Sequence, residues 1–555
     1  ATVLAARGIP PSEAAAEALE RETSLTISPM LMRDMGKAVA RIQKALANDE
    51  TIAVFGDYDV DGITSTVLLL DYLKNCGAKC LRYIPRRIED GYGLSKDAIQ
   101  GLRDKGATLM ITVDCGITGN EEIDFAASIG MDVVVTDHHE CKENLPRAVA
   151  VVDPHRPDDT YPFKYLAGVG VALKLVLALG GPDRENALFA RYCTLAAIGT
   201  IADVMRMEGE NRTIVSCGLA ALNHTDFVGI HALLKEAGLL GKPITSIQIG
   251  FVLSPRINAA GRMRMDENDE NAWPSGGHAA VELLIEGNES LAEEFGSVID
   301  GFNQDRKCID RSVTQEAHDF IEAHAELKAA KSTVIYNPRW MKGIVGIVAS
   351  RLIETYYRPT VVLTMSNGFV TGSARSVPGF DLYQAIESCS DLLENFGGHM
   401  YAAGLTMRPE RVEEFTRRFN AYVEENIDPI TLQPQVEIDS ELFFSNITPA
   451  FRRDLNRFQP FGPGNPAPVF VTRGVVSHGE TKLVGADCEH LRMDLMQRQK
   501  PNTTIQTIAF QQPTHYEWIR AGHPIDVCYQ IVENHYRGSV SVQLRIKDIK
   551  PVMNR

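Results

Sequence analysis

Short apolar runs alternate with helix-like segments in the first third of the chain, and this alternation restricts the possible folds more than any other feature. Helix-like segments at 65–74 and 119–129 lie between runs that have the length and β-branched content of buried strands, at residues 51–55, 107–113, 132–136 and 148–152. Apolar strands separated by helices are typical of a parallel sheet. The pattern predicts an α/β fold with its site at the carboxyl ends of the strands.

The chain has 555 residues, which is too many for one core and predicts further domains. A polar, acidic stretch at 264–278 is interpreted as a loop or insertion, and 279–327 as a long connecting helix. The last part alternates apolar and polar residues between Gly and Pro, which favours a small β-barrel. We therefore expect a helical segment at 1–45, an α/β domain at 46–262, an insertion and connector at 263–330, a smaller α/β domain at 331–428 and a barrel region at 429–555.

Charge and cysteine content limit the partners and the cellular compartment that are expected for the protein. The formal net charge of −16 argues against a polyanionic partner. Residues 470–555, however, hold 11 Lys and Arg against 8 Asp and Glu, so a local basic groove is permitted. Ten cysteines without a CxxC pair argue against a disulfide framework and favour a reducing cytoplasm. We find no apolar run of about 18 residues and no signal-peptide order at the start.

Four apolar stretches end in acidic or imidazole side chains. The stretches are VFGDYDVDG, ITVDCG, VVVTDHHE and AAIGTIADV. Their polar residues are Asp57, Asp59, Asp61, Asp114, Asp137, His138, His139 and Asp203. An isolated Asp at a strand end is more often a helix N-cap, and a single DHH triplet is as often a surface turn. Four such elements in an α/β order predict instead that the side chains meet at one sheet edge.

A divalent metal site would explain such a gathering of carboxylates. Buried carboxylates are costly unless neutralised, and their mutual repulsion raises their pKa values. Asp with His is the ligand set expected for Mn²⁺ or Mg²⁺, and imidazole favours Mn²⁺. Two ions about 3.5–4 Å apart can activate water and stabilise a phosphoryl displacement. The constellation therefore predicts metal-dependent phosphoester chemistry.

The four motifs resemble, in the same order, those of the DHH phosphoesterase superfamily. SPRINAAGR at 254–262 resembles a fifth motif of its RecJ exonucleases, and FGGHMYAAG at 396–404 resembles the signature of the companion DHHA1 domain. The end of the chain, after FGPGNPAPVF, is similar to the RecJ OB-fold. The resemblance implies a DHH catalytic domain at 46–262, a DHHA1 domain at 331–428 and an OB-fold with a C-terminal region at 429–555.

The resemblance also implies roles for the polar residues. Two divalent ions, Mn²⁺ in preference to Mg²⁺, would be held by Asp57, Asp59, Asp61, Asp114, His138 and Asp203. Asp114 would bridge the ions, while Asp137 and His139 would orient ligands and protonate the leaving oxygen. Shorter DHH phosphatases carry a His where this chain has Phe55, so Asp57 is expected to take over its role.

Arginines beside glycine turns are the expected phosphate-binding residues, because guanidinium pairs with phosphate oxygens. The resemblance implies that Arg87, Ser373 and Arg375 bind the 5′ end of the substrate. It implies that Arg256 and His399 contact the phosphate being cut, and Asn258 lies in the same segment as Arg256. The alternative for each Arg is a solvated salt bridge, and for His399 a packed side chain between glycine turns.

The implied activity is 5′→3′ hydrolysis of single-stranded DNA to 5′-mononucleotides in recombination and repair. The implied partners are single-stranded DNA with a 5′ end, a single-stranded-DNA-binding protein and a RecQ-type helicase, with the protein itself a cytoplasmic monomer. One alternative is a phosphodiesterase of short oligoribonucleotides or cyclic dinucleotides, which the OB unit and the GDYDVDG form of the first motif disfavour. The other is a non-catalytic DNA-binding or scaffold protein derived from this family.

Overall fold

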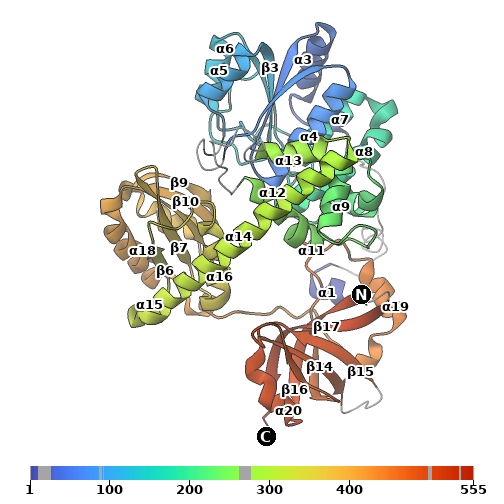
Figure 1. Ribbon diagram of the computed structural model, residues 1–555, viewed down its shortest axis with the longest axis vertical. Helices are drawn as coiled ribbons and strands as arrows, with labels where there is room; N and C mark the ends of the chain where they lie inside the picture. The colour runs from blue at the N-terminus through green and yellow to red at the C-terminus, as the bar shows by residue number, and fades with distance from the viewer. Residues whose placement is uncertain are drawn as a thin grey trace. The chain divides into compact units, whose positions relative to one another are not determined.

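The structure is a computed structural model of the chain. It describes residues 2–9, 27–86, 91, 93–261, 277–497, 503–536 and 539–553. The chain divides into two compact units, one of residues 24–205 with 209–434 and one of residues 1–23, 206–208 and 435–555. The larger unit holds two sheet domains and the long helix α14 (Glu289–Ala323), which packs against helices of both (Figure 1).

The first sheet has five parallel strands in the order β2-β1-β3-β4-β5. They are β1 (Thr51–Gly56), β2 (Lys79–Tyr83), β3 (Ala107–Val113), β4 (Asp132–Thr136) and β5 (Ala150–Val152). The chain moves from β1 to β2 on one side and then to β3 on the other, so the strand order reverses between β1 and β3. Such a switch point opens a crevice at the carboxyl ends of the strands. The predicted parallel α/β sheet is confirmed.

Helices cover both faces of this sheet, because the strands are apolar on both sides. On one face Phe55, Met110 and Val135 pack against Ile99 and Ile123 of neighbouring helices. The helices of this domain are α3 (Met35–Ala47), α4 (Val60–Asn75), α5 (Lys96–Asp104), α6 (Asn120–Ser128) and α7 (Gly168–Gly180). The helix expected at 65–74 begins earlier, at Val60, because the Asp59 side chain caps its first turn.

A helical region follows the sheet. It consists of α8 (Glu185–Ala202), α9 (Gly209–Ala221), α10 (Val228–Glu236), α11 (Ser246–Gln248), the π-helical turn η4 (Ile249–Leu253), α12 (Ser254–Ala260), α13 (Gly277–Ile285), α14 and α15 (Ala325–Ala329). The single helix predicted for 279–327 is wrong, because the chain leaves the helix after Ile285 and Asn288 caps the start of α14. Of the predicted insertion at 264–278, residues 264–276 lie outside the described residues.

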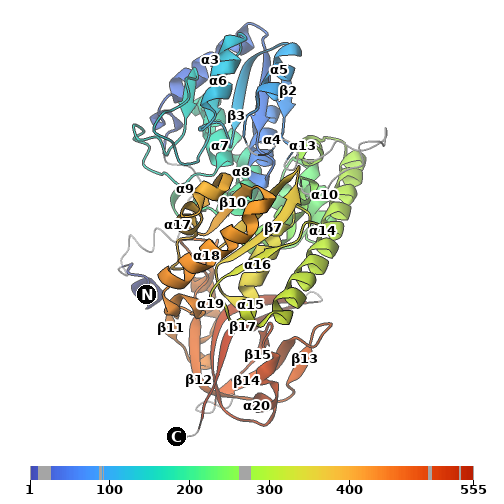
Figure 2. The ribbon, with the colours of Figure 1, turned by 90° about the vertical axis from the view of Figure 1, so that its left-hand side faces the viewer.

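The second sheet has the order β6-β7-β8-β10-β9, and only its β6–β7 pair is parallel. Its elements are β6 (Thr333–Tyr336), α16 (Val345–Tyr356), β7 (Thr360–Ser366), β8 (Phe369–Arg375), α17 (Leu382–Glu387), β9 (Leu393–His399), β10 (Ala402–Met407) and α18 (Val412–Asn426). Val361 and Leu363 pack on the side of α17 and α18, while Val362 between them packs with α16 and α14. Figure 1 shows α18 and α16 on opposite sides of this sheet, and Figure 2, turned by 90°, looks onto the domain from the side of α18.

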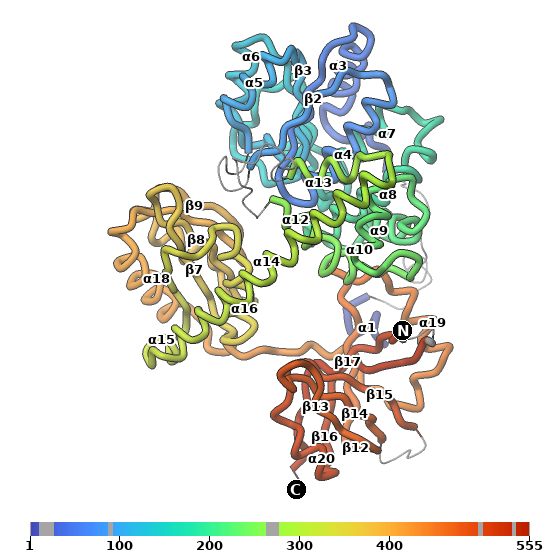
Figure 3. The backbone as a smooth tube through the Cα atoms, viewed as in Figure 1, coloured from blue at the N-terminus to red at the C-terminus, as the bar shows by residue number. Residues whose placement is uncertain are grey.

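The smaller unit is a barrel, whose chain path is clear in Figure 3. Five strands follow the order β12-β16-β17-β15-β14, and a β12–β14 pairing closes them. Its elements are β11 (Ser440–Glu441), α19 (Pro449–Asn456), β12 (Phe470–Ser477), β13 (Lys482–Val484), β14 (His490–Gln497), β15 (Thr504–Ala509), α20 (Tyr516–Arg520), β16 (Ile525–Tyr536) and β17 (Ser539–Pro551). Val3 and Leu4 of α1 (Thr2–Ala6) join Phe444 and Tyr529 in its core. The predicted OB-like barrel is confirmed.

Within the ranges described, the helices are too short or too polar for any of them to cross a membrane.

Candidate metal centre

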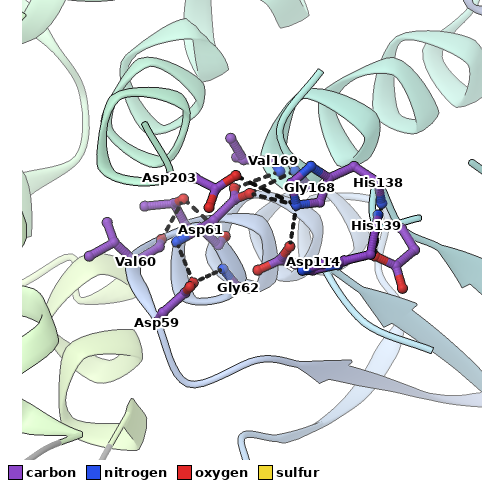
Figure 4. A network of polar contacts seen from close by, with 12 residues as sticks. Asp59, Val60, Asp61, Gly62, Asp114, His138, His139, Gly168, Val169 and Asp203 are labelled. Atoms are coloured by element: carbon purple, nitrogen blue, oxygen red, sulfur yellow. Dashed lines mark hydrogen bonds and ion pairs between the residues drawn. The ribbon is translucent and has the colours of Figure 1, made fainter. Parts of the chain in front are cut away.

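Four segments far apart in sequence meet at the carboxyl edge of the first sheet (Figure 4). Asp57 follows β1, Asp114 follows β3, His138 and His139 follow β4, and Asp203 ends α8. Their ligand atoms form three groups in which all atoms lie within 4.8 Å of one another: Asp114 with His138 and His139, Asp61 with His138 and Asp203, and Asp57 with Asp59 and Asp114. The fold thus brings together all six residues predicted to hold metal.

His138 lies at the middle of this cluster. Its Nε2 is 3.1 Å from Asp114 Oδ1, 3.6 Å from Asp203 Oδ2 and 3.8 Å from Asp61 Oδ2. The side chains of Asp61, Asp114 and His138 are at most 8% exposed, whereas Asp203 is 28% and His139 37% exposed. The cluster is therefore open to solvent on the side of Asp203 and His139.

Backbone amides position two of the carboxylates. Asp61 accepts hydrogen bonds from the N–H groups of Gly168 and Val169 at 2.7 and 2.8 Å, at the start of α7. A helix N-terminus carries partial positive charge and suits an anion. Asp59 accepts from the N–H groups of Asp61 and Gly62 and is the N-cap of α4. Sequence reasoning missed the α7 amides, although the glycines in AGVGVA were a signal of close backbone approach.

Glycine makes this convergence possible. A Cβ at Gly168 would lie 2.6 Å from Asp114 Oδ1, and one at Gly199 would lie 2.9 Å from Asp61 Oδ1. Asp114 itself has φ of 60°, in the left-handed region where non-glycine residues are uncommon and often functional. The cluster therefore has no room for a side chain larger than hydrogen at these two glycines.

Gly168→Ala should lower turnover about a hundredfold, because the new methyl group displaces Asp114 by a fraction of an ångström to an ångström. Steady-state kinetics on the substrate that the family resemblance implies would measure the loss. The matched control is Gly101→Ala in α5, where a Cβ meets nothing within 4 Å. That control should keep full activity, and equal turnover of both variants would contradict the tight packing.

The protonation of the cluster fits a divalent cation. Burial, followed by repulsion from Asp59, raises the pKa of Asp61 to about 7. Burial and the neighbouring carboxylates hold the pKa values of Asp114 and Asp203 well above the ordinary range. Burial lowers the pKa of His138 to about 3, so its imidazole is neutral. Crowded carboxylates around a neutral imidazole are a donor set that Mn²⁺ or Mg²⁺ would satisfy.

His139 differs from His138 although the two are adjacent in sequence. Burial lowers the pKa of His139, but the hydrogen bond between its Nδ1 and Asp137 Oδ1, at 2.7 Å, together with the negative charges of Asp137, Asp203 and Asp57, outweighs burial and raises that pKa to about 9. Asp137 is fully buried and also accepts from the N–H groups of Ile117 and His138. Asp137 therefore orients His139, and the His139 ring is protonated on both nitrogens, and so cationic, at neutral pH.

Metal should stabilise the protein more at pH 8 than at pH 5. The raised carboxylate pKa values mean that the folded metal-free chain binds protons more tightly than the unfolded chain. Its stability is therefore lost as pH rises from about 4, the unfolded pKa, through about 7, the folded pKa of Asp61. Thermal scans with Mn²⁺ should show a rise in Tm larger by at least about 5 °C at pH 8 than at pH 5. Equal rises at both pH values would count against the cluster as the metal site.

The predicted substrate residues of the first domain are only partly placed. Arg87 lies outside the described residues. Arg256, on α12, is 8% exposed. Its Nε lies 2.8 Å from Asp300 Oδ1 of α14, and its Nη1 donates to the Val252 carbonyl at 2.7 Å. Asn258 lies on the same helix, whose end approaches the first motif: a Cβ at Gly261 would be 3.4 Å from the Tyr58 carbonyl.

The predicted residues of the second domain form a separate group at one end of its sheet. Arg375 Nη1 donates to Ser373 Oγ at 2.9 Å, both on β8. The strand register sets Ala402 of β10 between Arg375 and His399. His399 is exposed at the end of β9. A Cβ at Gly346 would lie 3.0 Å from Ser373 Oγ, so the start of α16 also faces this group.

Comparison with known proteins agrees with both domains and the barrel. Family models match as the DHH family, N-terminal domain, at residues 51–200, the DHHA1 domain at 329–425 and the RecJ OB domain at 438–548. The single-stranded-DNA-specific exonuclease RecJ of Bacillus subtilis is 35% identical over 550 residues, covering 99% of this chain and 67% of that protein. The Escherichia coli protein of the same name is 32% identical, with 97% and 94% covered.

Solved structures agree as well. RecJ of Thermus thermophilus in complex with Mn²⁺ has a TM-score of 0.80 and 27% identity, covering 100% of this chain and 76% of that chain. The Mg²⁺ complex from the same organism has a TM-score of 0.74, 26% identity and coverage of 100% and 74%. A parallel-sheet domain with an acidic and imidazole cluster, joined to a smaller mixed-sheet domain, defines the DHH/DHHA1 class of phosphoesterases. Within that class, the chain belongs to the RecJ family of single-stranded-DNA-specific exonucleases.

Proposed function

We propose that this protein is a metal-dependent exonuclease that hydrolyses single-stranded DNA from the 5′ end to 5′-mononucleotides. One observation carries the proposal: the carboxylates that follow β1 and β3 and the carboxylate at the end of α8 surround the neutral imidazole of His138, which follows β4. Sequence identity of 35% and 32% to single-stranded-DNA-specific exonucleases, over nearly the whole chain, supports single-stranded DNA as the substrate. The OB-like barrel supports it too, because such barrels bind single strands.

Six side chains would hold two divalent ions, Mn²⁺ or Mg²⁺: Asp57, Asp59, Asp61, Asp114, His138 and Asp203. When bound, the ions would supply Lewis-acid charge and lower the pKa of the attacking water. The α7 amides fix Asp61, and the amides of α4 fix Asp59, so these carboxylates are preorganised. His138 stays neutral and presents Nε2 to the carboxylates.

His139 is proposed as the group that protonates the leaving 3′ oxygen. Asp137 holds the Nδ1 side of the ring, so the second proton of the imidazolium is on Nε2. The side chain is 37% exposed, on the open side of the cluster where a strand would enter. Arg256 and His399 are proposed to contact the phosphate being cut, and Asn258 to bind beside it. Ser373, Arg375 and Arg87 are proposed to hold the 5′ end of the substrate, in keeping with the family resemblance.

Labelled oligonucleotides test the activity. With Mn²⁺ and single-stranded DNA labelled at its 5′ end, labelled mononucleotide should appear from the earliest time, while a 3′ label should shorten gradually. The same sequence in a blunt duplex is the control and should be degraded far more slowly. Cleavage restricted to short oligoribonucleotides or cyclic dinucleotides would favour the alternative phosphodiesterase, and binding without cleavage would favour a non-catalytic role.

The cellular setting is also a proposal. A role in recombination and repair, with a single-stranded-DNA-binding protein and a RecQ-type helicase as partners and the protein as a monomer, is supported by the family resemblance alone. None of the ten cysteines is part of a disulfide, which supports a reducing cytoplasm as the compartment.

A further inference from the structure

Phe251 has the most exposed side chain among the large apolar residues that the structure describes, at 80%. Val204 is 67% and Ile247 is 44% exposed. A single exposed apolar residue is ordinary, but three on neighbouring segments are not, because each leaves apolar area in water. We call Val204, Ile247 and Phe251 the apolar rim.

The local backbone holds the rim in this exposed arrangement. Phe251 lies in the π-helical turn η4, and such turns are rare and frequent at functional sites. η4 packs against the end of α8, where a Cβ at Gly250 would be 3.7 Å from Ile201 Cγ2. Val204 has φ of 58°, which a β-branched residue rarely adopts. A strained Val that still points into water indicates a use for its side chain.

The rim borders the open side of the metal centre. Val204 directly follows Asp203, the metal-ligand candidate whose side chain is 28% exposed while Asp61 is 1% exposed. Ile201, which η4 contacts, lies two residues before Asp203. At its other end η4 continues directly into α12, the helix of Arg256. A substrate whose phosphate lies at the cluster would therefore have its neighbouring groups beside the rim.

We propose that the apolar rim is a nucleobase subsite, in which the Phe251 ring stacks on a base of the single strand beside the phosphate being cut. The inference rests on the proposed function. The rim carries no charge, so it does not suit the phosphates, which the cluster and Arg256 would serve. Every base has an apolar π-face, and stacking on an aromatic ring tolerates any sequence. A duplex keeps its bases stacked inside, so the subsite favours single strands.

The subsite can be tested by a thermodynamic cycle in which the Phe251 ring and the nucleobase are removed singly and together. The substrates are 5′-phosphorylated single strands, intact or with one abasic site placed in turn at each of the first positions from the 5′ end. Phe251→Ala should lower kcat/KM on the intact strand about tenfold. An abasic site at one position should cost the wild type about as much, and should cost Phe251→Ala nothing further. Phe251→Trp should keep most of the activity. The matched control is Phe320→Ala on α14, where the Phe is also exposed, at 45%.

Each outcome decides something. Unchanged kcat/KM in Phe251→Ala, with hydrolysis intact, would overturn the subsite and leave the proposed function standing. Phe251→Ala could instead lower kcat/KM by the same factor on the intact strand and on every strand with an abasic site. That result would also overturn the subsite, since the ring would then act without touching a base. Normal cleavage with altered self-association of the variant would assign the rim to a protein contact instead. No hydrolysis by the wild type on intact strands would overturn the proposed function itself.

Discussion

Replacing Asp114 with alanine should lower kcat on single-stranded DNA by about a thousandfold or more while the protein stays folded. Asp114 belongs to two of the three ligand groups, so its loss would affect both ion positions. The fold should survive because the pKa of this buried carboxyl lies well above its usual range. Removing the group relieves repulsion in the metal-free protein rather than breaking a stabilising ion pair.

Kinetics and metal analysis together check this prediction. The Asp114→Ala variant should bind less Mn²⁺ per chain than the wild type, and its Tm without metal should be no lower. Asp104→Ala, an exposed carboxylate on α5, is the matched control and should keep both activity and metal. If Asp114→Ala kept its turnover, Asp114 would not be part of the active site, and the assignment of the metal centre would be refuted.

Deleting the barrel should raise KM for single-stranded DNA about tenfold or more and change kcat by less than about threefold. The reason is that the barrel would extend the binding surface, whereas the ligand cluster belongs entirely to the other unit. The deletion should run from residue 435 and include residues 1–23, because Val3 and Leu4 pack into the barrel core. A cut after Pro460 would be misplaced, since it would leave the barrel core residues Phe444 and Phe458 on the shortened chain without the rest of that core.

The length of the substrate gives the control for this deletion. A strand of a few nucleotides is too short to occupy the metal centre and the barrel at once. The full and shortened chains should therefore cleave it with equal KM. A longer strand should show the difference. Equal KM values on long strands would remove the barrel from substrate binding.

Local sequence patterns predicted most of the architecture, because strand burial leaves a continuous apolar run. The strand at 107–113 was predicted to the residue, since it is buried along nearly its whole length. β2 was missed, because it is a half-exposed edge strand without that pattern. The break before α14 was missed as well, although Gly287 and the capping Asn288 marked it.

The residue types that could make a metal site, and the strand ends at which they stand, were already predictable from the order of residues in the chain. How those residues are held and charged depends on contacts that exist only in the folded protein. The amides that bind Asp61 lie 107 and 108 residues away along the chain, and Asp300 pairs with Arg256 from another helix. His138 and His139 are neighbours in sequence, yet burial makes one neutral, while Asp137 and the other nearby carboxylates together make the other cationic. Protonation depends on the dielectric surroundings and charges that folding brings together, and no local pattern of residues contains that information.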